Sequence, residues 1–69
     1  EHLELELYYT MIKDLPDMYR IVFNLYAIEG YSHYEISELI EIKESSSRVY
    51  LMRARTMLQE KIKSYEKQY

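Results

Sequence analysis

Apolar residues recur along this chain at the three- and four-residue spacings of amphipathic helices, in four runs separated by breaks. Pro16 separates the first run from the second, because proline is favoured in the first turn of a helix. Gly30 ends the second run, because glycine reaches the left-handed conformation without steric cost. Helices are therefore expected near residues 4–14, 17–29, 33–40 and 46–65. With one glycine and one proline in 69 residues, the pattern predicts an all-α, four-helix domain without a sheet or winged features.

The second expected helix is apolar almost all round, with only a narrow polar stripe that includes Arg20. A helix of this kind packs against several neighbours at once, so we expect it to be the central buried element. Its apolar residues are Met18, Tyr19, Ile21, Val22, Phe23, Leu25, Tyr26 and Ile28.

The third and fourth expected helices form a helix-turn-helix over about residues 33–60. Ser32 and Glu35 have the spacing of a capping box at the start of the third helix, whose apolar face is expected to be Ile36, Leu39 and Ile40. One side of the fourth helix is apolar and faces the core: Leu51, Ala54, Leu58, Ile62 and Tyr65.

The outward side of the fourth helix carries side chains that suit base recognition. Arginine pairs with guanine, serine bonds bases or phosphates, and valine contacts a thymine methyl group. The side chains that point outward or flank this face are Ser45, Ser46, Arg48, Val49, Tyr50, Met52, Arg53 and Thr56. From spacing alone, a DNA-reading helix and an ordinary helical hairpin with a solvated polar face both remain open.

Three blocks of residues decide between these interpretations. They are Leu15–Phe23 with its Leu-Pro, Arg and Val-Phe, Glu29–Glu38 with its Glu-Gly-Tyr-Ser, and Arg53–Leu58 with its Arg-Ala-Arg. In order and spacing the blocks resemble region 4 of bacterial RNA polymerase sigma factors, and most closely the extracytoplasmic-function group. The resemblance covers roughly residues 13–62.

The resemblance implies sequence-specific binding of the −35 promoter element, which directs RNA polymerase to initiate transcription. It implies double-stranded promoter DNA and the β-subunit flap of the polymerase core as partners, with an anti-sigma factor as a further candidate. Arg20 is expected to reach a backbone phosphate, and the start of the third helix at Ser32 is a second expected phosphate contact. The full set of expected DNA contacts is Arg20, Ser32, Ser45, Ser46, Arg48, Val49, Tyr50, Met52 and Arg53.

Some positions depart from the family pattern. Glu41 stands where a glycine commonly makes the turn, so the backbone there is expected to be strained or differently wound. Ser47 replaces a common core valine, and its hydroxyl is expected to bond locally or to leave the helix less tightly held. Val49 and Tyr50 also differ from the residues usual in the family, which predicts a preferred base sequence different from that of relatives.

Two other residues are expected to have no direct part in DNA binding. Arg55 is expected to form a structural ion pair, and His33 is expected to be an exposed side chain without a role.

Composition narrows the remaining functions. The net charge is −3, but the charges are unevenly distributed. Residues 1–44 hold ten acidic and three basic residues, whereas residues 45–69 hold two acidic and six basic residues. This basic C-terminal third suits a polyanion. The absence of cysteine excludes disulfides and Cys-based metal sites and fits a cytoplasmic protein.

No sequence motif indicates a catalytic centre, a cofactor or a metal, since His2 and His33 have no partner at ligand spacing. No apolar run is long enough to span a membrane. Residues 1–69 are interpreted as one DNA-binding domain, and the lack of an initial methionine suggests a fragment of a longer protein. Two alternatives remain: a helical protein-interaction module with a degenerate DNA face, and the DNA-binding domain of a response regulator.

Overall fold

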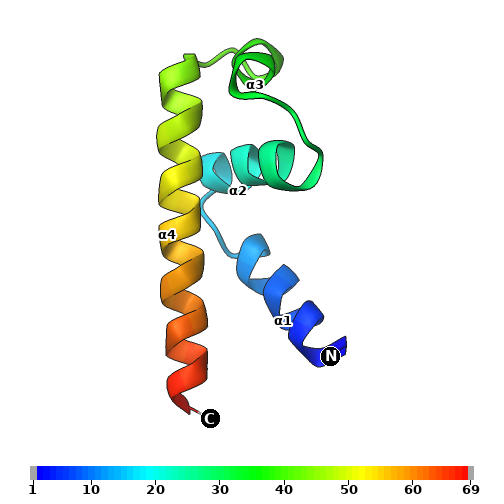
Figure 1. The fold of residues 1–69 in the computed structure, drawn as a ribbon, viewed down its shortest axis with the longest axis vertical. Helices are drawn as coiled ribbons and strands as arrows, with labels where there is room; N and C mark the ends of the chain where they lie inside the picture. Colours follow the sequence, from blue (N-terminus) through cyan, green and yellow to red (C-terminus); the bar gives the residue numbers. More distant parts are fainter. Residues whose placement is uncertain (1, 69) are drawn as a thin grey trace.

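A long C-terminal helix carries the other helices along one of its sides in the computed structural model, which describes residues 2–68 (Figure 1). No strand occurs in this range, which confirms the all-α prediction. None of the helices in it is long and apolar enough to cross a membrane. The elements in chain order are α1 (His2–Lys13), α2 (Asp17–Phe23), a π-helical turn η1 (Asn24–Ile28), α3 (His33–Leu39) and α4 (Glu44–Gln68).

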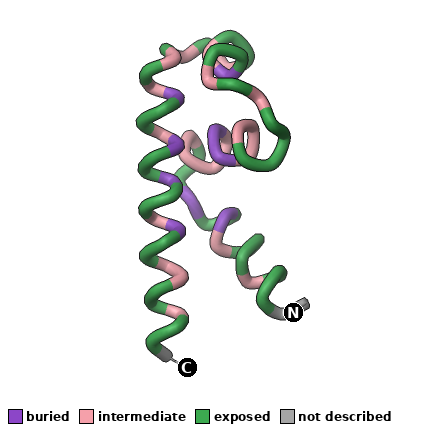
Figure 2. The backbone as a smooth tube through the Cα atoms, viewed as in Figure 1, coloured by how far each residue is buried: buried purple, intermediate pink, exposed green. Residues whose placement is uncertain are grey.

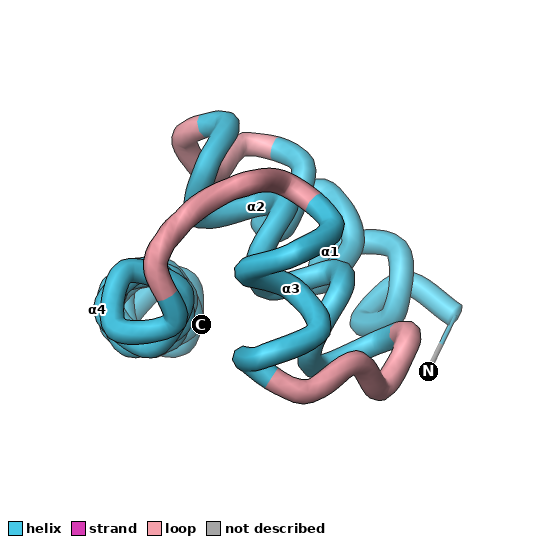
Figure 3. Tube along the Cα trace, turned by 90° about the horizontal axis from the view of Figure 1, so that it is seen from above, coloured by secondary structure: helices cyan, strands magenta, loops and turns pink. Residues whose placement is uncertain are grey.

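The three shorter α-helices contact α4 at different heights. Helix α3 lies beside the N-terminal end of α4, and α2 crosses its middle (Figure 1). Helix α1 lies at the height of the C-terminal half of α4 and diverges from α4 toward its own N-terminus (Figure 1). Viewed along α4, these elements all lie to one side of it (Figure 3). The opposite side of α4 is therefore left open to solvent.

The core is formed where α2 and α3 meet the inner side of α4. Buried positions recur along that side of α4 (Figure 2), and the predicted inward residues Leu51, Ala54 and Leu58 are 0–3% exposed. Val22 and Ile36 are fully buried against them, and burial of such a side chain contributes about 1.5–3 kcal/mol. The core set is Ile12, Leu15, Val22, Phe23, Ile36, Leu51, Ala54 and Leu58.

The prediction of one regular helix over residues 17–29 was wrong in its second half. From Asn24 the chain winds as a π-helix, and the Glu29 amide donates to the Asn24 carbonyl at 3.0 Å. This wider turn changes the direction in which later side chains point, so Ile28 is 56% exposed rather than buried. Gly30 then ends the segment at φ +84°, as predicted.

The predicted capping box at the start of α3 is confirmed. The Glu35 amide donates to the Ser32 hydroxyl at 3.1 Å, and the Ser32 amide donates to the Glu35 carboxylate at 2.9 Å. The expected apolar face of α3 is narrower than predicted, because Ile36 is buried while Leu39 is 56% exposed.

The turn between α3 and α4 is a Schellman-type end with an unusual residue in the left-handed position. The Ile42 amide donates to the Ser37 carbonyl at 3.1 Å, and Glu41 between them has φ +56°. The backbone at Glu41 was expected to be either strained or differently wound, and the structure shows the strained alternative. A left-handed conformation costs a non-glycine residue about 1–2 kcal/mol.

Replacing Glu41 with glycine should therefore stabilise the protein. Relief of the left-handed strain exceeds the entropic cost of glycine, so Glu41→Gly is expected to gain about 0.5–1 kcal/mol in the free energy of unfolding and to raise the melting temperature by about 4 °C. Thermal unfolding followed by circular dichroism measures both.

Gly30→Ala is the matched control. A Cβ at Gly30 meets nothing within 4 Å, so its cost is the positive φ alone and the variant should be less stable than wild type. A lower melting temperature for Glu41→Gly would contradict the assignment of strain to this turn.

Candidate nucleic-acid interface

Five of the predicted DNA contacts line one shallow depression on the open side of α4. Helical spacing places them on adjacent turns of its N-terminal half, and the depression has a volume of about 270 Å³. Val49 is 37% exposed within it, and Met52 beside it is 59% exposed although both side chains are apolar. The five residues are Ser45, Ser46, Val49, Tyr50 and Arg53.

Arg53 is oriented by an aromatic pair that bridges α2 and α4. The rings of Tyr19 and Tyr50 lie 5.8 Å apart, and Arg53 Nη1 donates to the Tyr19 hydroxyl at 3.4 Å. This contact is long for a hydrogen bond and the guanidinium stays exposed, so its remaining donors face solvent.

Arg48 lies on the same helix but is already paired. Its guanidinium forms an ion pair with Glu44 one turn earlier, and both side chains are substantially exposed. An exposed pair of this kind is worth about 0.2–1 kcal/mol. For Arg48 to contact a base, only this weak ion pair with Glu44 has to break.

The two expected contacts outside α4 both have internal partners. Arg20 Nη1 lies 3.1 Å from the Asp17 carboxylate and donates to the Leu15 carbonyl at 3.4 Å. Ser32 uses its hydroxyl and its amide in the capping box with Glu35. The phosphate contacts expected of Arg20 and Ser32 therefore stay predictions.

His33 is the residue that sequence reasoning missed. Its ring is half-buried and stacks on Tyr26 with centroids 4.4 Å apart, and Nδ1 lies 2.8 Å from the hydroxyl oxygen of Ser47. Ser47 is fully buried, and its hydroxyl pairs with a residue of α3. The expected local bond is therefore replaced by a contact between two helices. The π-helical turn, which has no simple sequence signal, is what places Tyr26 against His33.

The prediction of an ion pair for Arg55 was wrong. Its guanidinium carbon lies 5.8 Å from the centre of the Tyr26 ring, a cation–π contact, and within residues 2–68 no carboxylate pairs with it. Tyr26 therefore contacts both His33 and Arg55 and connects η1 to α3 and α4.

Burial is the largest influence on the charge state of His33. It lowers the pKa of the imidazole below the ordinary value, the Arg48 guanidinium lowers that pKa further, Glu44 opposes the shift, and Arg55 adds a smaller lowering. The folded protein therefore favours neutral His33.

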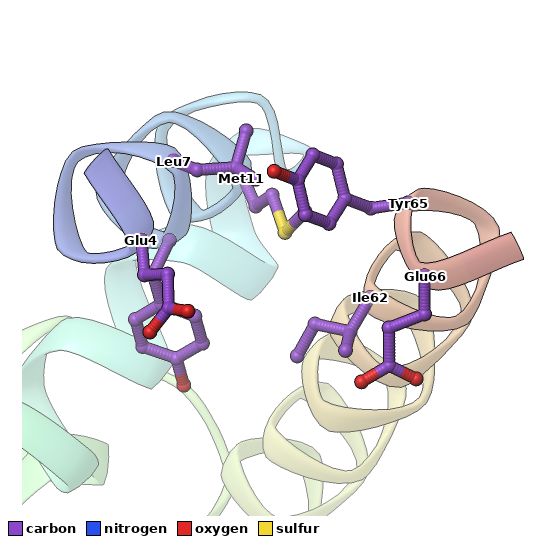
Figure 4. A pocket seen from close by; sticks show the side chains of 7 residues that line it. Glu4, Leu7, Met11, Ile62, Tyr65 and Glu66 are labelled. Atoms are coloured by element: carbon purple, nitrogen blue, oxygen red, sulfur yellow. The ribbon is translucent and has the colours of Figure 1, made fainter. Parts of the chain in front are cut away.

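A second hollow lies at the other end of α4. It has a volume of about 310 Å³ and separates α1 from the C-terminal half of α4, with apolar side chains on both walls and a glutamate at either edge (Figure 4). We call it the α1–α4 groove; its lining is Glu4, Leu7, Tyr8, Met11, Ile62, Tyr65 and Glu66.

The part of the chain that the structure describes offers no grouping of three His, Cys, Asp or Glu side chains that could hold a metal ion.

In the comparisons with known proteins, the family model described as Sigma-70, region 4, matches residues 5–58. No curated protein and no solved structure matches this chain.

Stability should fall on mild acidification because of His33. In the unfolded chain a histidine binds a proton near pH 6.5, whereas the lowered pKa of His33 resists protonation in the folded protein. The unfolded state then binds more protons, so this contribution is complete above about pH 6.5 and is lost as the pH falls through the lowered value.

Urea denaturation between about pH 5 and pH 8 measures this effect. His33→Phe, which keeps an aromatic ring, should reduce the loss of unfolding free energy between pH 7 and pH 5. His2→Gln removes the other histidine of the chain and serves as the control. An unchanged pH profile in His33→Phe would show that another group is responsible.

Proposed function

The chain belongs to the sigma-70 region 4 family, and we propose that it binds the −35 element of promoter DNA and positions RNA polymerase there to initiate transcription. The family is one of DNA-binding, non-catalytic domains. The observation that carries the proposal is the exposed face of α4 between Ser45 and Arg53, which projects on the side opposite the core.

This face has the shape and chemistry for the major groove. A helix fits that groove with its side chains toward the base edges, and α3 with its turn holds the N-terminal half of α4 at the end of the molecule (Figure 1). The basic excess of residues 45–69 attracts the phosphate backbone, whereas the acidic excess of residues 1–44 keeps non-specific affinity low.

The residues of the face divide into reading and supporting roles. Arg53 and Arg48 read bases, and Val49 adjusts the preference through contact with a thymine methyl group. The Ser45 and Ser46 hydroxyls bond phosphates or bases at the start of the helix. Tyr50, which packs on Tyr19, and Met52 flank the reading residues. Outside this face, Arg20 of α2 and Ser32 at the start of α3 contact the DNA backbone.

The polymerase is proposed to bind elsewhere, in the α1–α4 groove. Ile62 of the groove follows Val49 by 13 residues, which corresponds to about 20 Å along a helix. DNA at one end of α4 and the flap of the β subunit at the other can therefore be bound together. The same apolar surface is available to an anti-sigma factor, which would compete with the polymerase.

Loss of either reading arginine should relax one position of the promoter. Arg53→Ala and Arg48→Ala are each expected to cost roughly 1–3 kcal/mol at the matching base pair and little elsewhere, because a bidentate Arg–guanine pair acts locally. The measurement is a binding titration of the full-length protein with polymerase against promoters altered one base pair at a time.

Arg20→Ala provides the contrast in the same titration. A phosphate contact should weaken binding to every sequence alike and reduce the salt slope by about one unit. Unchanged base preferences in folded Arg48→Ala and Arg53→Ala would reject α4 as the reading helix and favour a protein-interaction module.

The groove assignment is tested by Ile62→Glu. A third carboxylate between Glu4 and Glu66 should weaken binding of the polymerase flap by about tenfold, while promoter preference stays as in wild type. Lys63→Glu changes charge at an exposed neighbour that does not line the groove. Equal flap binding by wild type and Ile62→Glu would place the polymerase on another surface.

A further inference from the structure

The first turn of α4 is held by a polar contact at a place where the core is otherwise apolar. Ser47 is 0% exposed and is the buried polar side chain among eight buried apolar ones in the described part of the chain. Its amide donates to the Lys43 carbonyl at 3.1 Å, and its hydroxyl pairs with His33 Nδ1 at 2.8 Å. The hydroxyl of a buried serine is costly to leave without a partner, so His33 is the group that makes serine acceptable here.

We propose that His33 and Ser47 act as a matched pair that fixes the angle between α3 and the DNA-reading end of α4, so that His33 is a positioning residue for promoter recognition. The inference rests on the proposed function. Ser47 lies directly between Ser46 and Arg48, two expected DNA contacts on the same turn of α4. A change in the position of Ser47 therefore moves both contacts relative to the DNA.

His33 is itself held in place from more than one element. Its ring stacks on Tyr26 of η1 at an interplanar angle of 20°, and Arg55 of α4 lies over that same tyrosine. His33 is also the first residue of α3, directly after the Ser32 cap. The contact with Ser47 thus joins the fixed start of α3 to the fixed start of α4.

The donor direction in this pair depends on the tautomer of the imidazole. When Nε2 carries the proton, Nδ1 is an acceptor and the Ser47 hydroxyl donates to it. The charged groups that influence the ring are Arg48, Arg55 and Glu44 of α4, and Tyr26 of η1 stacks on it. Burial and Arg48 lower the pKa of the imidazole, which favours the neutral ring that this donor direction needs.

A direct phosphate contact by His33 is the competing explanation, and salt dependence separates the two. A side chain that neutralises a phosphate contributes about 0.9 to the slope of log K against log salt. A positioning residue changes the affinity and leaves that slope unaltered. The tautomer of His33, observed by nitrogen NMR of the ring, gives a further signature of the bond to Ser47.

Four variants of the full-length protein, each assayed with polymerase and promoter DNA at a temperature where it is fully folded, test the pair. His33→Phe keeps the ring and loses the hydrogen bond, and Ser47→Ala loses the hydroxyl. His33→Asn offers a polar atom near the place of Nδ1, and the double variant His33→Phe with Ser47→Ala removes both partners. Tyr34→Phe is the control, since it removes an exposed hydroxyl bonded to Glu38 on the same helix.

The proposal predicts that His33→Phe and Ser47→Ala each weaken specific binding by about fivefold, with the salt slope of wild type. The double variant should bind no more weakly than either single variant, because all three lose the same bond. His33→Asn should recover most of the affinity, and Tyr34→Phe should bind as wild type does. In Ser47→Ala the NMR signature of the Nδ1 acceptor should disappear.

Three results would overturn the inference. These are wild-type affinity in both single variants, additive losses in the double variant, or a salt slope that is shallower in His33→Phe alone. If the wild-type protein itself fails to discriminate promoter sequences, the proposed function fails and this inference fails with it. If the wild-type protein discriminates promoter sequences and the His33 and Ser47 variants bind as wild type does, the inference is rejected and the proposed function stands.

Discussion

The apolar stripe on the inner side of α4 determines what the rest of the molecule can do. Leu51, Ala54 and Leu58 are buried against α2 and α3, so the rotation of α4 about its own axis is fixed by packing. Because a helix turns by about 100° per residue, fixing these three side chains also fixes where Val49 and Arg53 point. The exposed face is thus a direct consequence of the core.

The length of α4 separates two kinds of surface. Its N-terminal half presents hydroxyls, arginines and exposed apolar groups to solvent, and its C-terminal half forms the α1–α4 groove with apolar walls (Figure 4). One rigid helix therefore connects the proposed DNA surface with the proposed polymerase surface. Their relative position requires no hinge, because the same hydrogen-bonded backbone carries both.

Sequence patterns predicted the parts of this structure that depend on local chemistry. Pro16 between α1 and α2, the Ser32 capping box and the turn at Gly30 each act over a few residues, and these predictions were confirmed. Helix periodicity predicted the four α-helices, but it did not predict the π-helical turn within residues 17–29. The inward residues of α4 followed from the same periodicity. The family blocks then identified the helix-turn-helix, which spacing alone left open.

The features that escaped prediction depend on tertiary contacts. The π-helical turn shifts Tyr26 out of the phase that an α-helix would give it, so its contacts with His33 and Arg55 had no signal in the sequence. The Ser47 hydroxyl found its partner 14 residues away, on another helix. At the candidate site, the outward face of α4 was predictable, whereas the pairing of Arg48 with Glu44 and the support of Arg53 by Tyr19 became visible only in the folded chain.

Promoter DNA is proposed to contact the N-terminal half of α4. Titration of the isotopically labelled full-length protein with a duplex that carries its −35 element, followed by amide chemical shifts, maps this contact residue by residue. The largest shifts are expected on residues 45–53, with small shifts in α1 and in the C-terminal half of α4. Shifts concentrated on the α1–α4 groove, with residues 45–53 unchanged, would contradict the proposed contact.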